Sequence, residues 1–192
     1  MKLSEIVESN GIIKNERFSK DNLSFNNLNG ISFENCVFDN IVFDNSGLQN
    51  MTFKTCEFSS CVFDNVSLDK VNFYNSKFIN VSFNDCIIKN MLIDDSFIMV
   101  LSYQNCNISF SNFKISKIDE ISIKNSNLNN VDFYNSKIEV MELYNNKNVS
   151  EVYLYSSKIE MVKGSMENMR GFYMSLEQIL DLVKKIGINL HE

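Results

Sequence analysis

Large apolar residues recur at every fifth position over most of the chain. From Phe18 to Leu143, all 26 sites spaced by five residues are Phe, Leu, Ile or Tyr. A second column of small or apolar residues precedes these sites by two, as Cys36 precedes Phe38. A period of five fits neither the 3.6 residues per turn of an α-helix nor the two-residue alternation of a long strand. Both columns are expected to point into one continuous core.

Asparagine dominates the position two residues after each large site. It stands at 35, 40, 45, 50, 65, 75, 80, 90, 105, 125, 130, 135 and 145. Asn tolerates a left-handed backbone conformation, and its side chain can form a hydrogen bond with the backbone of its own turn. This column therefore predicts a turn every five residues. Four such units close a square coil, and successive coils then stack as short parallel strands about 4.8 Å apart.

Every fourth unit of the repeat carries a similar large residue, which supports the four-sided coil. One column formed in this way is wholly aliphatic: Leu28, Leu48, Leu68, Ile88, Ile108 and Leu128. Another is mostly aromatic: Phe33, Phe53, Phe73, Ile93, Phe113 and Phe133. Like side chains would therefore stack from coil to coil, which predicts an all-β fold.

Several segments resemble the pentapeptide-repeat proteins. CVFDN at 36–40 and again at 61–65, SLDKVNFYNSKF at 67–78 and VDFYNSKI at 131–138 are typical of that family. The resemblance covers residues 16–163 and implies a right-handed quadrilateral parallel β-helix of about seven coils.

The repeat slips by one residue after Leu143. Leu154 and Ile159 continue the large apolar column only if one residue is inserted within 144–149. Residues 144–148 are therefore expected to form a bulge or small loop. It is either a recognition loop or an irregularity of the last coil.

Residues 164–192 follow a different pattern and are expected to form a C-terminal helical cap. Ser175 and Gln178 match a capping box, which predicts an α-helix at 176–186. Its apolar positions are Leu176, Ile179, Leu180, Val183 and Ile186. This helix is expected to close its own solenoid, and a second hypothesis is that the same face, with Phe172, also pairs two chains; the two roles are compatible. Similarity to quinolone-resistance members of the family implies a dimer through such a module.

Residues 1–15 are expected to cap the other end. Leu3, Ile6 and Val7 are spaced as on a short helix.

Composition argues against several kinds of chemistry. The net charge of −6 disfavours direct binding of nucleic acid through a basic surface. His191 is the only histidine, which leaves no His-based triad or multi-histidine metal site. The cysteines all fall in the small inward column, at 36, 56, 61, 86 and 106, and are expected to be buried free thiols. We therefore expect no catalytic residue, no metal and no cofactor.

The sequence contains no run of about 18 apolar residues, so it predicts no membrane span. The N-terminus is too polar for a signal peptide. A cytoplasmic protein is expected.

The expected function is an interaction scaffold with a protein partner of unknown identity. Outward positions should be polar, yet the stretch 87–101 places Ile87, Leu92, Phe97 and Met99 there. These four residues are the candidate partner surface, unless the coil is irregular and some of them fold inward. Tyr74, Tyr134 and Tyr144 are also expected to point outward.

The resemblance implies an alternative function, since some members of the family mimic DNA and bind type II topoisomerases such as DNA gyrase. The most acidic predicted side carries Asp44, Asp64, Asp85 and Glu142. The negative charge of this side per unit length is well below that of duplex DNA, which carries one charge per ~1.7 Å of its axis.

Overall fold

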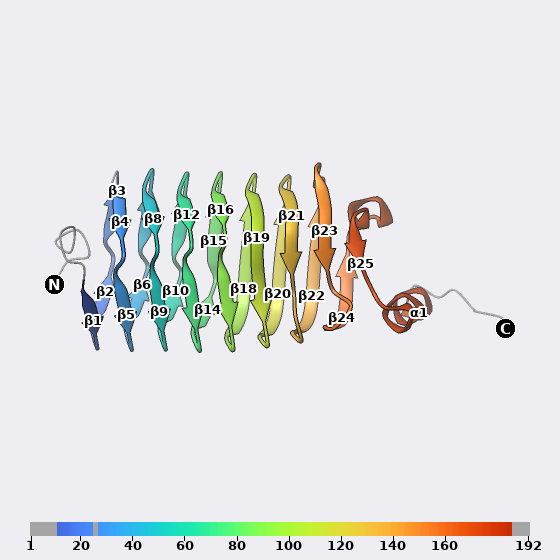
Figure 1. Cartoon of the computed structure of the whole chain (residues 1–192), viewed down its shortest axis with the longest axis horizontal. Helices are drawn as coiled ribbons and strands as arrows, with labels where there is room; N and C mark the ends of the chain where they lie inside the picture. Colours follow the sequence, from blue (N-terminus) through green and yellow to red (C-terminus); the bar gives the residue numbers. More distant parts are fainter. Residues whose placement is uncertain (1–10, 25–26, 186–192) are drawn as a thin grey trace.

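The computed structural model of this protein describes residues 11–24 and 27–185. These residues wind into a four-sided rod of about eight turns, built from stacked short parallel strands (Figure 1). This confirms the predicted all-β quadrilateral solenoid. The predicted N-terminal helix around Leu3, Ile6 and Val7 lies outside the described residues.

Each turn of the rod contributes one strand to each of four sides. The strands of side 1 are β1 (Ile12–Lys14), β5 (Ser32–Glu34), β9 (Thr52–Lys54), β13 (Asn72–Tyr74) and β17 (Leu92–Asp94). Those of side 2 are β2 (Arg17–Ser19), β6 (Val37–Asp39), β10 (Glu57–Ser59) and β14 (Lys77–Ile79). Those of side 3 are β3 (Asn22–Ser24), β7 (Val42–Asp44), β11 (Val62–Asp64) and β15 (Val81–Asn84). Those of side 4 are β4 (Asn27–Asn29), β8 (Gly47–Gln49), β12 (Ser67–Asp69) and β16 (Ile87–Lys89).

In the second half of the rod, strands continue around a corner. Sides 2 and 3 are joined by β18 (Phe97–Gln104), β20 (Lys117–Lys124), β22 (Lys137–Tyr144) and β24 (Lys158–Lys163). Sides 4 and 1 are joined by β19 (Asn107–Lys114), β21 (Asn127–Asp132) and β23 (Val149–Tyr153), and β25 (Phe172–Tyr173) ends side 1. Because β1 and β25 extend the stack at both ends, the rod has more turns than the seven predicted and begins before residue 16.

The register places like residues above one another. Phe58 pairs with Phe38 in the coil before it and with Phe78 in the coil after it. The rings of Phe38 and Phe58 stack with centroids 4.7 Å apart. All 26 large apolar sites from Phe18 to Leu143 are buried, which confirms the five-residue period.

The predicted one-residue slip is also confirmed. Lys124 pairs with Tyr144, exactly four repeat units later, whereas Leu128 pairs with Val149, which lies one residue beyond the fourth unit. Asn146 takes the inward position there. Its amide group accepts a hydrogen bond from the Ser126 N–H at 3.0 Å and donates one to the Ile123 carbonyl at 3.0 Å. The extra residue is therefore absorbed in a small loop without loss of pairing.

Left-handed turns form most corners of the rod. Each of the 13 predicted Asn turn residues has a φ between 46° and 56°. Inside one corner, each serine hydroxyl accepts a hydrogen bond from the backbone N–H of the residue one coil earlier. The Ser76 N–H, for example, donates to Ser96 Oγ at 3.0 Å. Such bonds satisfy buried donors where the ladder of the sheet is interrupted.

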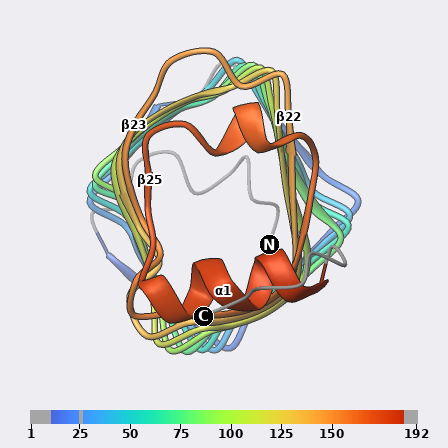
Figure 2. The ribbon, with the colours of Figure 1, turned by 90° about the vertical axis from the view of Figure 1, so that its right-hand side faces the viewer.

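The C-terminal end carries a short 3-10 helix, η2 (Met166–Met169), and the helix α1 (Leu176–Lys185). The capping box is confirmed, since the Ser175 N–H donates to Gln178 Oε1 at 2.7 Å and the Gln178 N–H donates to Ser175 Oγ at 3.2 Å. Gln178 Nε2 also donates to the carbonyls of Leu154 and Ser157, both at 2.6 Å. Figure 2 shows α1 lying along one side of the square end, which it does not cover completely.

Candidate functional site

The predicted partner residues do not form one patch. Ile87 lies on side 4, Leu92 on side 1, and Phe97 and Met99 on side 2. Ile87 and Met99 are exposed, whereas Leu92 and Phe97 are half-buried. The coil itself is regular, because β18 pairs in register with the coils on both sides. The four residues therefore face three directions.

Phe97 contributes instead to a groove at the corner between sides 1 and 2. Ile115 and Lys117 line it with Phe97, and the Lys117 ammonium lies 5.0 Å from the Phe97 ring centroid. The groove has a volume of about 490 Å³, and its lining includes the small residues Ser76 and Ser96.

The predicted acidic side is divided in two. Asp44 and Asp64 pair in neighbouring coils on side 3, and Asp85 lies at the next corner. Glu142 lies farther along the same side, where Lys163 and Lys124 contact it at 3.0 Å and 3.5 Å. The hydrogen bond from Lys163 holds the pKa of Glu142 below its usual range. The other three carboxylates take part in none of the ion pairs found among the described residues.

Some of the predicted C-terminal residues line an open apolar cavity of about 930 Å³. Phe172, Ile179 and Val183 line it, together with Met161 and Met174. No residue of α1 is buried. The apolar residues Leu176, Ile179 and Leu180 are exposed on the helix, and Ile186 lies outside the described residues.

The thiols offer no accessible nucleophile. All five cysteines are free and buried. Burial raises the pKa of Cys56 to about 12 and that of Cys61 to about 11, which disfavours the reactive thiolate. Within residues 11–24 and 27–185, no three His, Cys, Asp or Glu side chains gather as metal ligands would.

A set of large side chains lies on side 1 and at its two corners in the second half of the rod. We call this set the aromatic surface: Phe110, Ile115, Tyr134, Tyr153, Tyr155 and Tyr173. All except Tyr153 are exposed, with Phe110 and Tyr155 each 55% accessible. The Tyr153 ring stacks on Tyr173 with centroids 5.0 Å apart and meets Tyr155 edge-on at 6.2 Å. Exposed large apolar and aromatic side chains on one part of a rod are a feature of contact surfaces.

Two members of the aromatic surface occupy corner positions where Asn is usual. Phe110 and Ile115 have φ values of 51° and 50°, in the left-handed region. This conformation is a genuine outlier for a β-branched residue and costs about 1–2 kcal/mol relative to a right-handed one. Stability alone therefore does not explain these two side chains.

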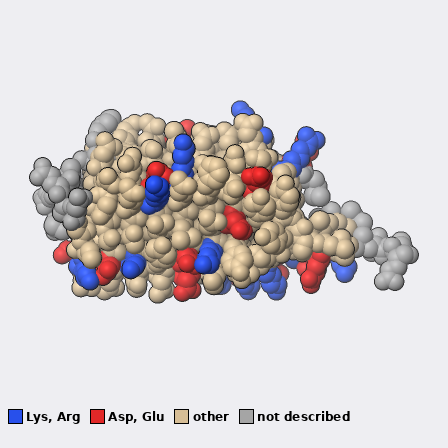
Figure 3. Space-filling view, in the orientation of Figure 1, with Lys and Arg blue, Asp and Glu red and all other residues tan. Residues whose placement is uncertain are grey.

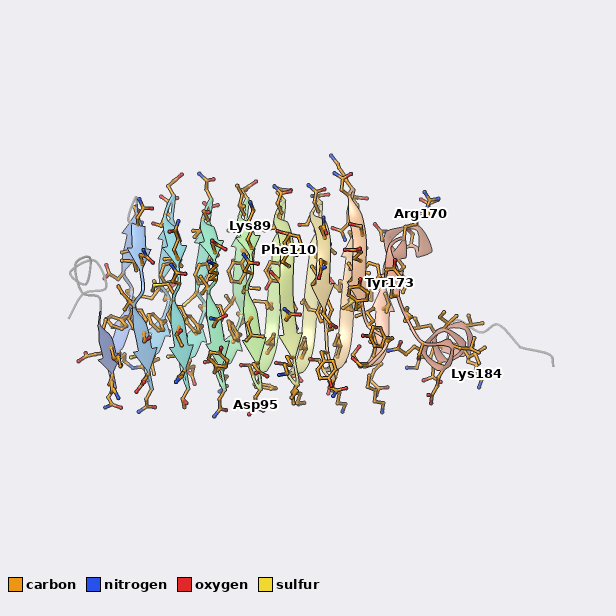
Figure 4. All side chains as sticks on the ribbon, in the orientation of Figure 1. Lys89, Asp95, Phe110, Arg170, Tyr173 and Lys184 are labelled. Carbon is orange, nitrogen blue, oxygen red and sulfur yellow. The ribbon has the colours of Figure 1, made fainter. Side chains whose placement is uncertain are left out.

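The charged groups beside the aromatic surface are one cation, Lys114, which lies one coil before Tyr134 on side 1, and two carboxylates. Asp132 pairs with Tyr153 across the ladder, and Glu151 occupies the adjacent corner. Desolvation raises the pKa of Asp132. Figure 3 shows isolated charged side chains on a mostly uncharged surface, and Figure 4 shows Phe110, Tyr173 and Arg170 along the rod.

Tyr134 was predicted to point outward, but the sequence reasoning did not connect it with Tyr153, Tyr155 and Tyr173. The signal was available, because Tyr155 stands one coil after Tyr134 once the frame slips by one residue. Phe110 and Ile115 were visible as replacements of the turn Asn.

The comparisons with known proteins found likeness mainly in structure. Residues 5–83, less than half of the chain, match the family model of the SV2A/B/C luminal domain. No curated protein matches the sequence. No helix within the described parts of the chain has the length and apolar character to cross a membrane.

Two solved structures illustrate the likeness. A trypsin-treated form of QnrB1, a plasmid-mediated fluoroquinolone resistance protein, is 18% identical. It aligns over 99% of this chain and 95% of its own length, with a TM-score of 0.58. HetL, a pentapeptide repeat protein involved in heterocyst differentiation regulation in the cyanobacterium Nostoc sp. strain PCC 7120, is 10% identical. It aligns over 91% of this chain and 97% of its own, with a TM-score of 0.32. The likeness to QnrB1 is one of fold.

Proposed function

We propose that this chain, which has the pentapeptide-repeat fold, is a non-catalytic scaffold that binds a protein partner through the aromatic surface. The observation that carries the proposal is the exposure of Phe110 and Ile115 at strained corners on either edge of side 1, which also carries the exposed tyrosines. A rod with a continuous buried core holds these side chains in fixed positions, so little order has to be gained on binding. The buried thiols suit a reducing compartment, and we place its action in the cytoplasm.

Site-directed photo-crosslinking in cells of the source organism tests this function. A benzophenone amino acid would replace Tyr134 or Tyr155 on the aromatic surface and, as a matched control, Val62 on side 3. The expected result is one adduct of a defined protein from positions 134 and 155 and none from 62. Absence of an adduct, or equal adducts from all three positions, would contradict the proposal.

We also propose that the C-terminal end joins two copies of the chain. Two features support this: the apolar cavity is open, and Leu176, Ile179 and Leu180 of α1 are exposed to solvent. We expect sedimentation velocity to show that the full chain is a dimer. The double variant Leu176→Asp with Leu180→Asp is expected to be a folded monomer. A monomeric wild-type chain across the micromolar range would overturn this assignment.

A second candidate function is binding of DNA gyrase as a DNA mimic. The alignment of Asp44 and Asp64 in one column on side 3, with Asp85 beside it, supports this candidate. The likeness to QnrB1 supports it only at the level of fold. A supercoiling assay with purified gyrase is expected to show inhibition that is lost when Asp44, Asp64 and Asp85 are changed to Asn. Undiminished inhibition by the triple variant would rule this side out.

A further inference from the structure

Four polar or charged side chains surround Tyr153 within the aromatic surface. Its phenol pKa is raised by desolvation first and then by the nearby Glu151, Tyr173, Tyr155 and Asp132. The ladder pairing of Asp132 with Tyr153 and the ring contacts of Tyr153 with Tyr155 and Tyr173 place these groups together on side 1, with Glu151 two residues before Tyr153. They do not act as separate surface residues.

The carboxylates of this site have no cationic partner. No ion pair among the described residues includes Asp132 or Glu151, although eight ion pairs occur elsewhere on the rod. Asp132 Oδ1 is buried and has no hydrogen-bond partner. A buried acceptor without a donor costs about 1–3 kcal/mol, so this carboxylate is poorly compensated in the free protein.

The exposed rings favour the same kind of occupant. The face of a tyrosine ring attracts a cation placed over it, and an arginine guanidinium stacks on such a face while it donates to carboxylates. Tyr153, Tyr155 and Tyr173 supply ring faces and edges, and Asp132 and Glu151 supply acceptors beside them. Arg170 lies toward the C-terminal end (Figure 4) and forms no ion pair within the described parts of the chain, so it leaves these acceptors available.

We infer that the aromatic surface binds an arginine-containing segment of the partner protein, with guanidinium groups against the tyrosine rings and beside Asp132 and Glu151. This inference rests on the proposed function and specifies the chemistry of its partner. The segment lies along side 1, across β23 and β25, which carry Tyr153 and Tyr173, and over Tyr134 in the turn after β21.

Fluorescence anisotropy with the full chain tests the inference. The probe is a fluorescein-labelled (Gly-Arg)₄ peptide, compared with (Gly-Lys)₄ and (Gly-Glu)₄ peptides of the same length. We expect the arginine peptide to bind at least about fivefold more tightly than the lysine peptide, because only arginine combines stacking with a planar set of donors. The glutamate peptide is expected not to bind.

Matched variants separate the site from general attraction to an acidic protein. Asp132→Asn with Glu151→Gln removes two charges from the site, and Asp44→Asn with Asp64→Asn removes two charges from side 3. The first variant is expected to weaken binding about tenfold and the second less than about twofold. Equal losses in both variants would overturn the inference, since they would mean that only the net charge attracts the peptide.

Ring variants test the tyrosines without disturbing the core, because the side chains point outward. Tyr134→Ala with Tyr155→Ala is expected to weaken binding about fivefold or more, whereas Tyr134→Phe with Tyr155→Phe retains it. Unchanged binding by the alanine variant would contradict the inference. If no basic peptide binds while the photo-crosslinked adduct still forms from positions 134 and 155, the proposed function stands and the cationic partner is wrong.

Discussion

Tyr103 fills the core position that Phe83 fills one coil earlier. The two rings stack with centroids 5.0 Å apart, and Tyr103 is fully buried. Its hydroxyl has no hydrogen-bond partner, and desolvation raises the phenol pKa well above its ordinary value. One coil therefore carries an unpaired polar atom inside an apolar stack.

Tyr103→Phe is expected to stabilise the protein. An unpaired buried hydroxyl costs about 1–3 kcal/mol, so its removal should raise the free energy of unfolding by about 1 kcal/mol or more. Urea denaturation followed by circular dichroism measures the change.

The converse variant is the matched control. Phe83→Tyr places a hydroxyl at the equivalent site one coil earlier and is expected to lower the free energy of unfolding. Opposite signs for the two variants support the explanation. A destabilised Tyr103→Phe would show that the hydroxyl has a partner.

Glu142 gives the clearest dependence of stability on pH at the residue scale. The hydrogen bond from Lys163, reinforced by Lys124, lowers its pKa in the folded state. A lowered folded pKa means that the stabilisation is present above the unfolded pKa and is lost as pH falls through the folded pKa. Glu142→Gln is expected to cost up to about 1 kcal/mol at neutral pH.

Thermal melts of wild type and Glu142→Gln between pH 7 and pH 3 measure this effect. The difference in melting temperature is expected to shrink below the ordinary pKa of a glutamate and to vanish in acid. A difference that stays constant down to pH 3 would mean that the carboxylate charge is not its source.

At the scale of the element, Gln178 has two roles in α1. Its Oε1 caps the helix at Ser175, while its Nε2 donates to Leu154 and Ser157 in the last coil. The capping box was predicted from the sequence because it involves residues three positions apart. The bonds to the last coil depend on tertiary placement and left no local signal.

Gln178→Glu separates these roles, because a carboxylate still accepts from Ser175 but has no donor for the two carbonyls. We expect faster hydrogen exchange in α1, with the exchange of β20 unchanged. The measurement is native hydrogen exchange by mass spectrometry. Unaltered protection in α1 would mean that other contacts, such as those of Lys185 with Glu160, are enough to hold the helix.

The corners show why strand lengths were harder to predict than strand positions. The Asn column located most turns, because left-handed φ is a property of single residues. At Val100, Glu120 and Val140 the chain passes from side 2 to side 3 without a left-handed residue, and the strands continue. Of these three residues, only Val100 lies within the stretch 87–101, where its replacement of the usual Asn was noticed in the sequence.

At the scale of the whole molecule, the four-unit period fixes which side a residue occupies. From that period the sequence analysis predicted the core positions and the column of acidic residues. It nevertheless interpreted the linear stretch 87–101 as one surface. In a four-sided coil, neighbours along the chain turn away from one another at every corner. A contiguous surface on one side of this rod therefore consists of residues one full coil apart, as Tyr134 and Tyr155 are.

The central claim is that the strained corners at Phe110 and Ile115 are retained for binding. The most direct measurement compares wild type with the double variant Phe110→Asn and Ile115→Asn, for melting temperature and for the adduct formed from position 134. We predict a higher melting temperature, because Asn accepts left-handed backbone more readily, together with loss of most of the adduct. A lower melting temperature, or an undiminished adduct, would contradict the claim.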